Sequence, residues 1–63
     1  MKRSKLIKYL ESQGCFFVRE GARHSLYGTK ERATTVPRHS EIPDILAQKI
    51  CRDLGIPKIR HDK

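Results

Sequence analysis

Cysteine is scarce in this sequence, and the two cysteines present form no recognisable motif. Cys15 and Cys51 are too few and too far apart for a disulfide scaffold. They make no CxxC pair and no metal-ligand cluster with the histidines. The pattern favours two buried, small apolar side chains in a reducing cytoplasm.

Long apolar runs and groups of carboxylates are also absent. No segment approaches the length of a membrane span, and the stretch MKRSKLIKYL lacks the unbroken apolar core of a secretory signal. The acidic residues are spread singly, so the sequence shows no carboxylate cluster that would hold a metal ion. We therefore expect a cytoplasmic protein with no membrane association, no metal and no cofactor.

What the sequence does have is positive charge on a short chain. Its 63 residues allow one domain, 1–63, and a core of that size stabilises the fold by only a few kcal/mol. The chain carries 14 Lys and Arg against 7 Asp and Glu, a formal net charge of +7. A field of one sign on so small a surface indicates a polyanionic partner, with nucleic acid as the first candidate. A membrane surface is the second candidate, and a role in solubility alone is the third.

The residue pattern predicts the element order α-β-β-β-α. Apolar residues at helical spacing, with Ser4 as the N-cap and Gly14 as the stop, predict a helix over 4–13. Short β-branched and aromatic stretches between turn residues predict strands over 15–20, 24–28 and 33–37.

The closing helix carries the clearest signals. Pro43 suits its first turn, and Asp44 is favourable there because of the helix dipole. Gly55 fits a left-handed stop, and Ile56 can fold back on the last turn as a Schellman contact. The apolar face of this helix comprises Leu46, Ala47, Ile50, Cys51 and Leu54, and a basic tail is expected over about 58–63.

These elements predict an α+β fold. A meander of three antiparallel strands has one face to bury, and two helices of this size can cover that face. The opposite face stays open to solvent or to a partner.

A histidine beside the first hairpin turn raises the question of catalysis. RNA carries its own nucleophile, and a histidine can move the necessary protons near neutral pH. Arginines can hold the phosphate. Arg19, Arg23 and His24 surround this turn, and Arg38 and His39 follow the third strand. Neighbouring strands of a meander can bring the two groups to one end of the sheet.

Each candidate also has a purely structural interpretation. His24 shares the strand parity of Leu26, so it can be a half-buried histidine at the edge of the core. His39 can be a second acid–base group, a phosphate contact or a loop residue. Tyr27 is interpreted as a packing residue rather than a base-stacking platform, and Phe16-Phe17 as core on one side and partner contact on the other.

Three stretches then carry a resemblance to a known family. ARHSLY on the second strand, TVPRHSEIP after the third and the closing ILAQKICRDLGI resemble the HicA toxins, over about residues 4–57. Most specific are the His-x-x-Tyr from His24 to Tyr27 and the pair Val36-Pro37 followed by His39. HicA toxins are small bacterial mRNA interferases with a double-stranded-RNA-binding-like fold, encoded beside a HicB antitoxin.

The resemblance implies a function and a site. It places the family's catalytic histidine on His24 of a metal-independent endoribonuclease, the toxin of a type II toxin–antitoxin system. It implies an mRNA substrate and a HicB-like acidic antitoxin that assembles with the toxin. The family usually has Gly-Ser before the histidine, whereas this chain has Ala22-Arg23, with Gly21 one place earlier. The alternative function is a non-catalytic RNA-binding module of the same fold.

Overall fold

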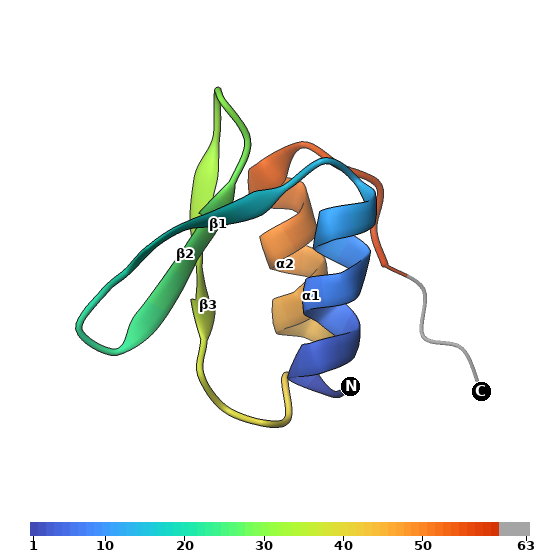
Figure 1. Cartoon of the computed structure of the whole chain (residues 1–63). Coiled ribbons are helices and arrows are strands. Elements are labelled where there is room, and N and C mark those ends of the chain that lie inside the picture. Colours follow the sequence, from blue (N-terminus) through green and yellow to red (C-terminus); the bar gives the residue numbers. More distant parts are fainter. Residues whose placement is uncertain (60–63) are drawn as a thin grey trace.

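The elements follow the predicted order, α-β-β-β-α. The computed structural model describes residues 1–59. Its elements are α1 (Arg3–Ser12), β1 (Phe16–Glu20), β2 (His24–Gly28), β3 (Ala33–Pro37) and α2 (Asp44–Leu54). The strands form one antiparallel sheet in the order β1-β2-β3, and both helices lie against the same face of it (Figure 1). The α+β architecture is therefore confirmed.

The core lies between the helices and this face of the sheet. Leu6 and Leu10 of α1, which are one helical turn apart, meet Val36 of β3 in a single buried cluster. The same cluster includes Cys15, Ile42, Ala47, Ile50, Cys51, Leu54 and Ile59. Neither helix is long and apolar enough to cross a membrane, among the residues that the structure describes.

The start of α1 differs from the prediction. Ser4 is not the N-cap: the helix begins at Arg3, Lys2 occupies the cap, and no side chain caps it. Tertiary contacts replace the missing cap, because the Arg3 N–H donates to the Ser40 carbonyl at 2.9 Å. Lys2 also forms a β-bridge with Glu41. A segment far along the chain therefore fixes this helix end, which a local capping rule does not anticipate.

The strand β1 begins at Phe16, one residue later than expected. Cys15 instead turns into the core, and its N–H donates to the Leu10 carbonyl at 3.0 Å. The core interpretation of the two phenylalanines is wrong. Phe16 and Phe17 keep 47% and 52% of their surface exposed and lie outside the buried cluster. The strand β1 is at the edge of the sheet, so its side chains have neighbours on one flank only.

The ends of α2 agree closely with the sequence signals. Pro43 is the N-cap, one residue before the predicted first turn, and Asp44 is in that turn. Gly55 is left-handed with φ 71°, and the Ile56 N–H donates to the Cys51 carbonyl at 3.1 Å. This is the bond pattern of a Schellman motif. Ile59 packs into the core, and the rest of the expected tail, 60–63, lies outside the described residues.

The strand register decides which side chains face the helices. Val36 is fully buried, and Thr34 Oγ1 donates to Asp53 of α2 at 3.2 Å, so both lie on the helix side. Side chains alternate along a strand, and directly paired residues share a face. By this pairing Ser25 and Tyr27 lie on the helix side, whereas His24, Leu26 and Thr35 lie on the open side.

Both cysteines are expected to resist alkylation while the protein is folded. Cys15 and Cys51 are buried and free. Burial, and secondarily the neighbouring Cys51, raise the pKa of the Cys15 thiol, so less of the reactive thiolate forms. Iodoacetamide followed by mass spectrometry should show no adduct in buffer and two adducts in guanidinium chloride. Rapid labelling in buffer would contradict the packing described here.

Candidate active site on the open sheet face

His24 is the first residue of β2 and lies on the face that the helices leave uncovered. It pairs with Pro37 of β3, and its side chain is exposed. The structural interpretation of His24 as a half-buried histidine at the core edge is therefore wrong. His24 does share the parity of Leu26, but that parity belongs to the open face. An exposed imidazole on an open sheet face is accessible to a large substrate.

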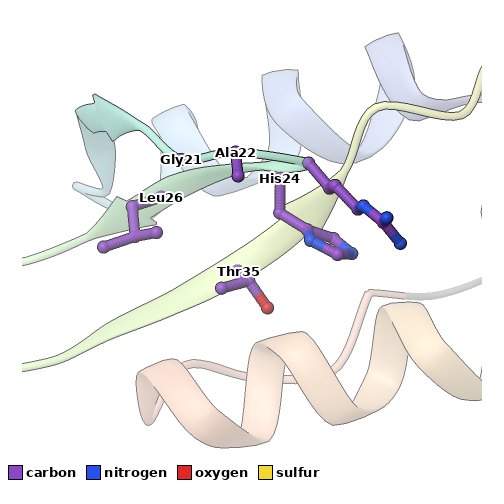
Figure 2. Close-up of a pocket in the computed structure, with 6 residues that line it drawn as sticks. Gly21, Ala22, His24, Leu26 and Thr35 are labelled. Carbon is purple, nitrogen blue, oxygen red and sulfur yellow. The ribbon is translucent and has the colours of Figure 1, made fainter.

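A shallow hollow surrounds this histidine. It measures about 310 Å³, and its lining comprises Gly21, Ala22, Arg23, His24, Leu26 and Thr35 (Figure 2). The turn forms one side of the hollow, and the apolar side chain of Leu26 and the hydroxyl-bearing side chain of Thr35 form its floor. No carboxylate lines the hollow, and an arginine does. The positive charge of Arg23 favours an anionic ligand in the hollow.

The turn before His24 is tight and depends on Gly21. The Gly21 N–H donates to the His24 carbonyl at 2.8 Å, which leaves Ala22 and Arg23 as the two loop residues. A Cβ on Gly21 would lie 2.9 Å from that carbonyl oxygen, closer than real Cβ contacts come. No non-glycine residue within 1–59 has positive φ, so this is not the type I′ turn that best suits a hairpin. Other contacts must hold the turn.

Arg38 supplies those contacts. Its Nη2 donates to the Ala22 carbonyl at 2.7 Å and to the Gly21 carbonyl at 3.5 Å, and its Nε donates to the Arg23 carbonyl at 3.4 Å. Its Nη1 lies 3.6 Å from Glu20 Oε2. One planar guanidinium thus binds three consecutive carbonyls and the carboxylate at the start of the turn. Sequence reasoning places Arg38 on a phosphate, whereas the structure engages its donors within the protein.

A chain of polar contacts continues from Arg38 to the first helix. Ser25 Oγ donates to Glu20 Oε1 at 2.6 Å, and it accepts from Arg3 Nη2 at 3.1 Å. Arg3 Nε also donates to the Pro37 carbonyl at 2.7 Å. Ser25 is only 3% exposed, so its hydroxyl must have partners. The network lies behind His24, on the helix side of the same strand.

The remaining sequence-predicted residues divide into two groups. Arg19 pairs with Leu26 across the sheet and so lies on the open face, and Arg23 lines the hollow. Neither guanidinium has a hydrogen bond or ion pair among residues 1–59, which leaves both available to a ligand. His39 does not line the hollow around His24. It lines a separate hollow of about 240 Å³ beside Ile42 and Leu46.

Comparison with known families decides what kind of protein carries this site. A family model described as the HicA toxin of bacterial toxin–antitoxin systems matches residues 3–56. The chain belongs to the HicA toxin family. No curated protein and no solved structure matches the chain. As a HicA toxin, the chain is one half of a toxin–antitoxin pair.

The structure shows where this toxin departs from the usual Gly-Ser before the histidine. Ala22 and Arg23 are the two loop residues of the turn, so the departure falls within the turn itself. Arg23 adds a guanidinium to the wall of the hollow. Gly21, one place earlier, is the residue that permits the close approach to the His24 carbonyl.

Sequence reasoning missed the residues behind the histidine: Arg3, Glu20 and Ser25. For Glu20 and Ser25 the sequence contained one indication of a contact. A two-residue turn at Ala22-Arg23 pairs Glu20 with Ser25, a carboxylate opposite a hydroxyl. No local pattern links Arg3 to Ser25, because 22 positions separate them.

Proposed function

We propose that this toxin is a metal-independent endoribonuclease that cleaves mRNA, with His24 as its general acid/base. The observation that carries the proposal is the exposed imidazole of His24 in a hollow without carboxylates on the uncovered sheet face. The arginines Arg19 and Arg23, which have no partner among residues 1–59, lie on the same face. An acid–base group next to cationic donors is what cleavage of a phosphodiester requires.

The chemistry uses the 2′-hydroxyl of RNA. That oxygen attacks the adjacent phosphorus and loses its proton, and the bond from phosphorus to the 5′-oxygen breaks as this oxygen gains a proton. His24 moves one of these protons. Residues 1–59 bring no second histidine into the hollow, so water exchanges the other proton. Arg23, which lines the hollow, offsets the negative charge that builds up on the phosphate oxygens, whereas Arg19, opposite Leu26, binds the RNA backbone further along the same face.

Arg38 has a different role in this proposal from the one the sequence suggests. Its contacts to three turn carbonyls and to Glu20 make it a positioning residue that fixes the start of β2. The position of His24 depends on the turn that Arg38 holds. A catalytic side chain displaced by about 1 Å can lose about 100-fold in rate.

A non-catalytic RNA-binding module is the second candidate function. It is supported by the same basic, uncovered face and by the net charge of +7. In that case His24 contributes to binding only. RNA incubated with the protein then stays intact.

The partner of this toxin is proposed to be a HicB-like acidic antitoxin that covers the open face around His24. Complementary charge favours that surface. An antitoxin bound there blocks RNA by occupying its site. Binding to the folded toxin also stabilises it, because a ligand specific for the native state shifts the folding equilibrium.

Cleavage is expected to continue when metal ions are removed. Among residues 1–59 no group of three His, Cys, Asp or Glu side chains is close enough to hold a metal. The test is incubation of the purified toxin with an mRNA in EDTA, with and without added excess Mg²⁺, followed by gel analysis. Equal cleavage in both arms supports the proposal. Cleavage only with Mg²⁺ contradicts the metal-independent mechanism, and intact RNA in both arms favours the binding module.

A further inference from the structure

An exposed aromatic ring lies on the open face at a distance from the histidine. Phe16 pairs with Gly28 across the sheet, and Gly28 has the strand parity of Leu26 and His24. Phe16 is therefore on the open face, with 47% of its surface exposed. The core does not use this ring, because Phe16 is not part of the buried cluster.

The neighbouring Phe17 provides a contrast within the same strand. It pairs with Tyr27 on the helix side, and the two rings meet edge to face with centroids 5.7 Å apart. Tyr27 packs against the core, so Phe17 has a structural partner. Phe16 has the same chemistry and a similar exposure, but it projects to the other face. No ring contact of Phe16 occurs within residues 1–59.

The position of Phe16 relative to His24 restricts what it can contact. The Gly28 opposite Phe16 is four residues from His24 along β2, which corresponds to about 13 Å. Leu26 lies between them on the same face, paired with Arg19. A substrate that reaches from the hollow to Phe16 therefore passes an apolar side chain and a guanidinium without a partner among residues 1–59. That distance exceeds the length of one nucleotide.

Charge on this face favours a polyanion over a second copy of the chain, and the exposed Phe16 ring favours nucleic acid among polyanions. The open-face side chains of β1 and β2 include Arg19 and His24 and no carboxylate, because Glu20 is directed to Ser25 on the helix side. A second copy with net charge +7 would be repelled. An aromatic ring next to cationic side chains on an open sheet is a surface on which unpaired bases stack.

We propose that Phe16 is a base-stacking subsite for single-stranded RNA and binds a base beyond the nucleotide whose phosphate lies at His24. The proposal rests on the ribonuclease function for the identity of the ligand. It specifies the substrate as unpaired, because the flat face of a base is accessible only when the base is not stacked within a duplex. In this arrangement the sugar–phosphate backbone of the RNA next to that base passes Arg19, which lies opposite Leu26.

The first test uses the absence of tryptophan from the sequence. In a His24→Ala background, which keeps RNA intact, Phe16→Trp places the sole indole on the open face, and Phe17→Trp places it on the other face. Titration with a short single-stranded oligoribonucleotide should quench the Phe16→Trp fluorescence and leave the Phe17→Trp fluorescence unchanged. Equal responses from both variants would overturn the proposal.

The second test measures affinity in the same background. Phe16→Ala should weaken binding of the oligoribonucleotide roughly tenfold, with the slope of affinity against salt unchanged, because stacking neutralises no phosphate. Phe17→Ala is the matched control and should change the affinity less than twofold. An RNA that lacks one base should bind the His24→Ala protein about as weakly as Phe16→Ala binds the complete RNA. The same missing base should cause no further loss of affinity in Phe16→Ala. Thermal melting of each variant checks that it is folded.

The outcomes separate this proposal from the function on which it rests. Unchanged RNA affinity in Phe16→Ala overturns the stacking subsite, and lost antitoxin binding in that variant would assign Phe16 to a protein interface instead. The proposal is also overturned if an RNA duplex binds as tightly as the single strand and loses as much affinity in Phe16→Ala. If the wild-type toxin cuts no RNA while both tests succeed, the nuclease assignment fails and the subsite stands.

Discussion

Replacing His24 by alanine is expected to abolish RNA cleavage and leave the fold intact. The imidazole is exposed on the open face, so its removal leaves no cavity in the core. Loss of a general acid or base typically lowers a rate about 10²- to 10⁴-fold. Cleavage of an mRNA by purified protein measures the effect, and circular dichroism of the same preparation verifies the fold. Induced expression of the variant should no longer arrest growth.

His39→Ala is the matched control for this experiment. His39 is also an exposed histidine, but it lines the separate hollow beside Ile42 and Leu46. Its replacement should retain most of the cleavage rate. A folded His24→Ala variant that cuts RNA at the parental rate would refute the catalytic assignment. Equal losses in both variants would indicate that two histidines share the proton transfers.

Replacing Arg38 by alanine should lower kcat by about 10- to 100-fold and change KM little. The reason is loss of the guanidinium that joins three turn carbonyls and Glu20, which releases the turn in front of His24. Because Arg38 and Glu20 are each about half exposed, the effect on the free energy of unfolding should be at most about 1 kcal/mol. Single-turnover cleavage kinetics over a range of enzyme concentrations separate the maximal rate from the half-saturating concentration.

Arg19→Ala is the contrasting variant, since Arg19 lies on the same face and has no partner among residues 1–59. It should raise KM and reduce the salt dependence of RNA binding, with kcat nearly unchanged. Arg38→Lys should recover only part of the rate, because an ammonium group is a point charge that cannot donate in a planar fork. If Arg38→Ala instead raises KM and leaves kcat unchanged, Arg38 is a phosphate ligand as the sequence predicts.

Local residue patterns were sufficient for the element order and for the position of several candidate site residues in it. The second and third strands and the Schellman end of α2 depend on neighbouring residues, so short-range rules locate them. His24 was correctly placed at a hairpin. Arg38 was correctly expected at the same end of the sheet, because adjacent strands of a meander return to the same edge.

Packing between distant segments decided the rest. Alternation along β2 groups His24 with Leu26 but does not say which of the two faces the helices will cover. Ser40 and Glu41, far along the chain, replace the expected cap of α1.

The partners of Arg38 show the same limit at the site itself. The sequence alone is equally compatible with an arginine that binds a phosphate and with one that donates hydrogen bonds within the protein. The choice depends on which acceptors lie within hydrogen-bonding distance. Three backbone carbonyls of the β1–β2 turn lie within reach of Arg38 because β2 and β3 pair with His24 opposite Pro37. Carbonyl direction is set by backbone geometry and not by residue type, so no composition or spacing rule could have predicted these contacts.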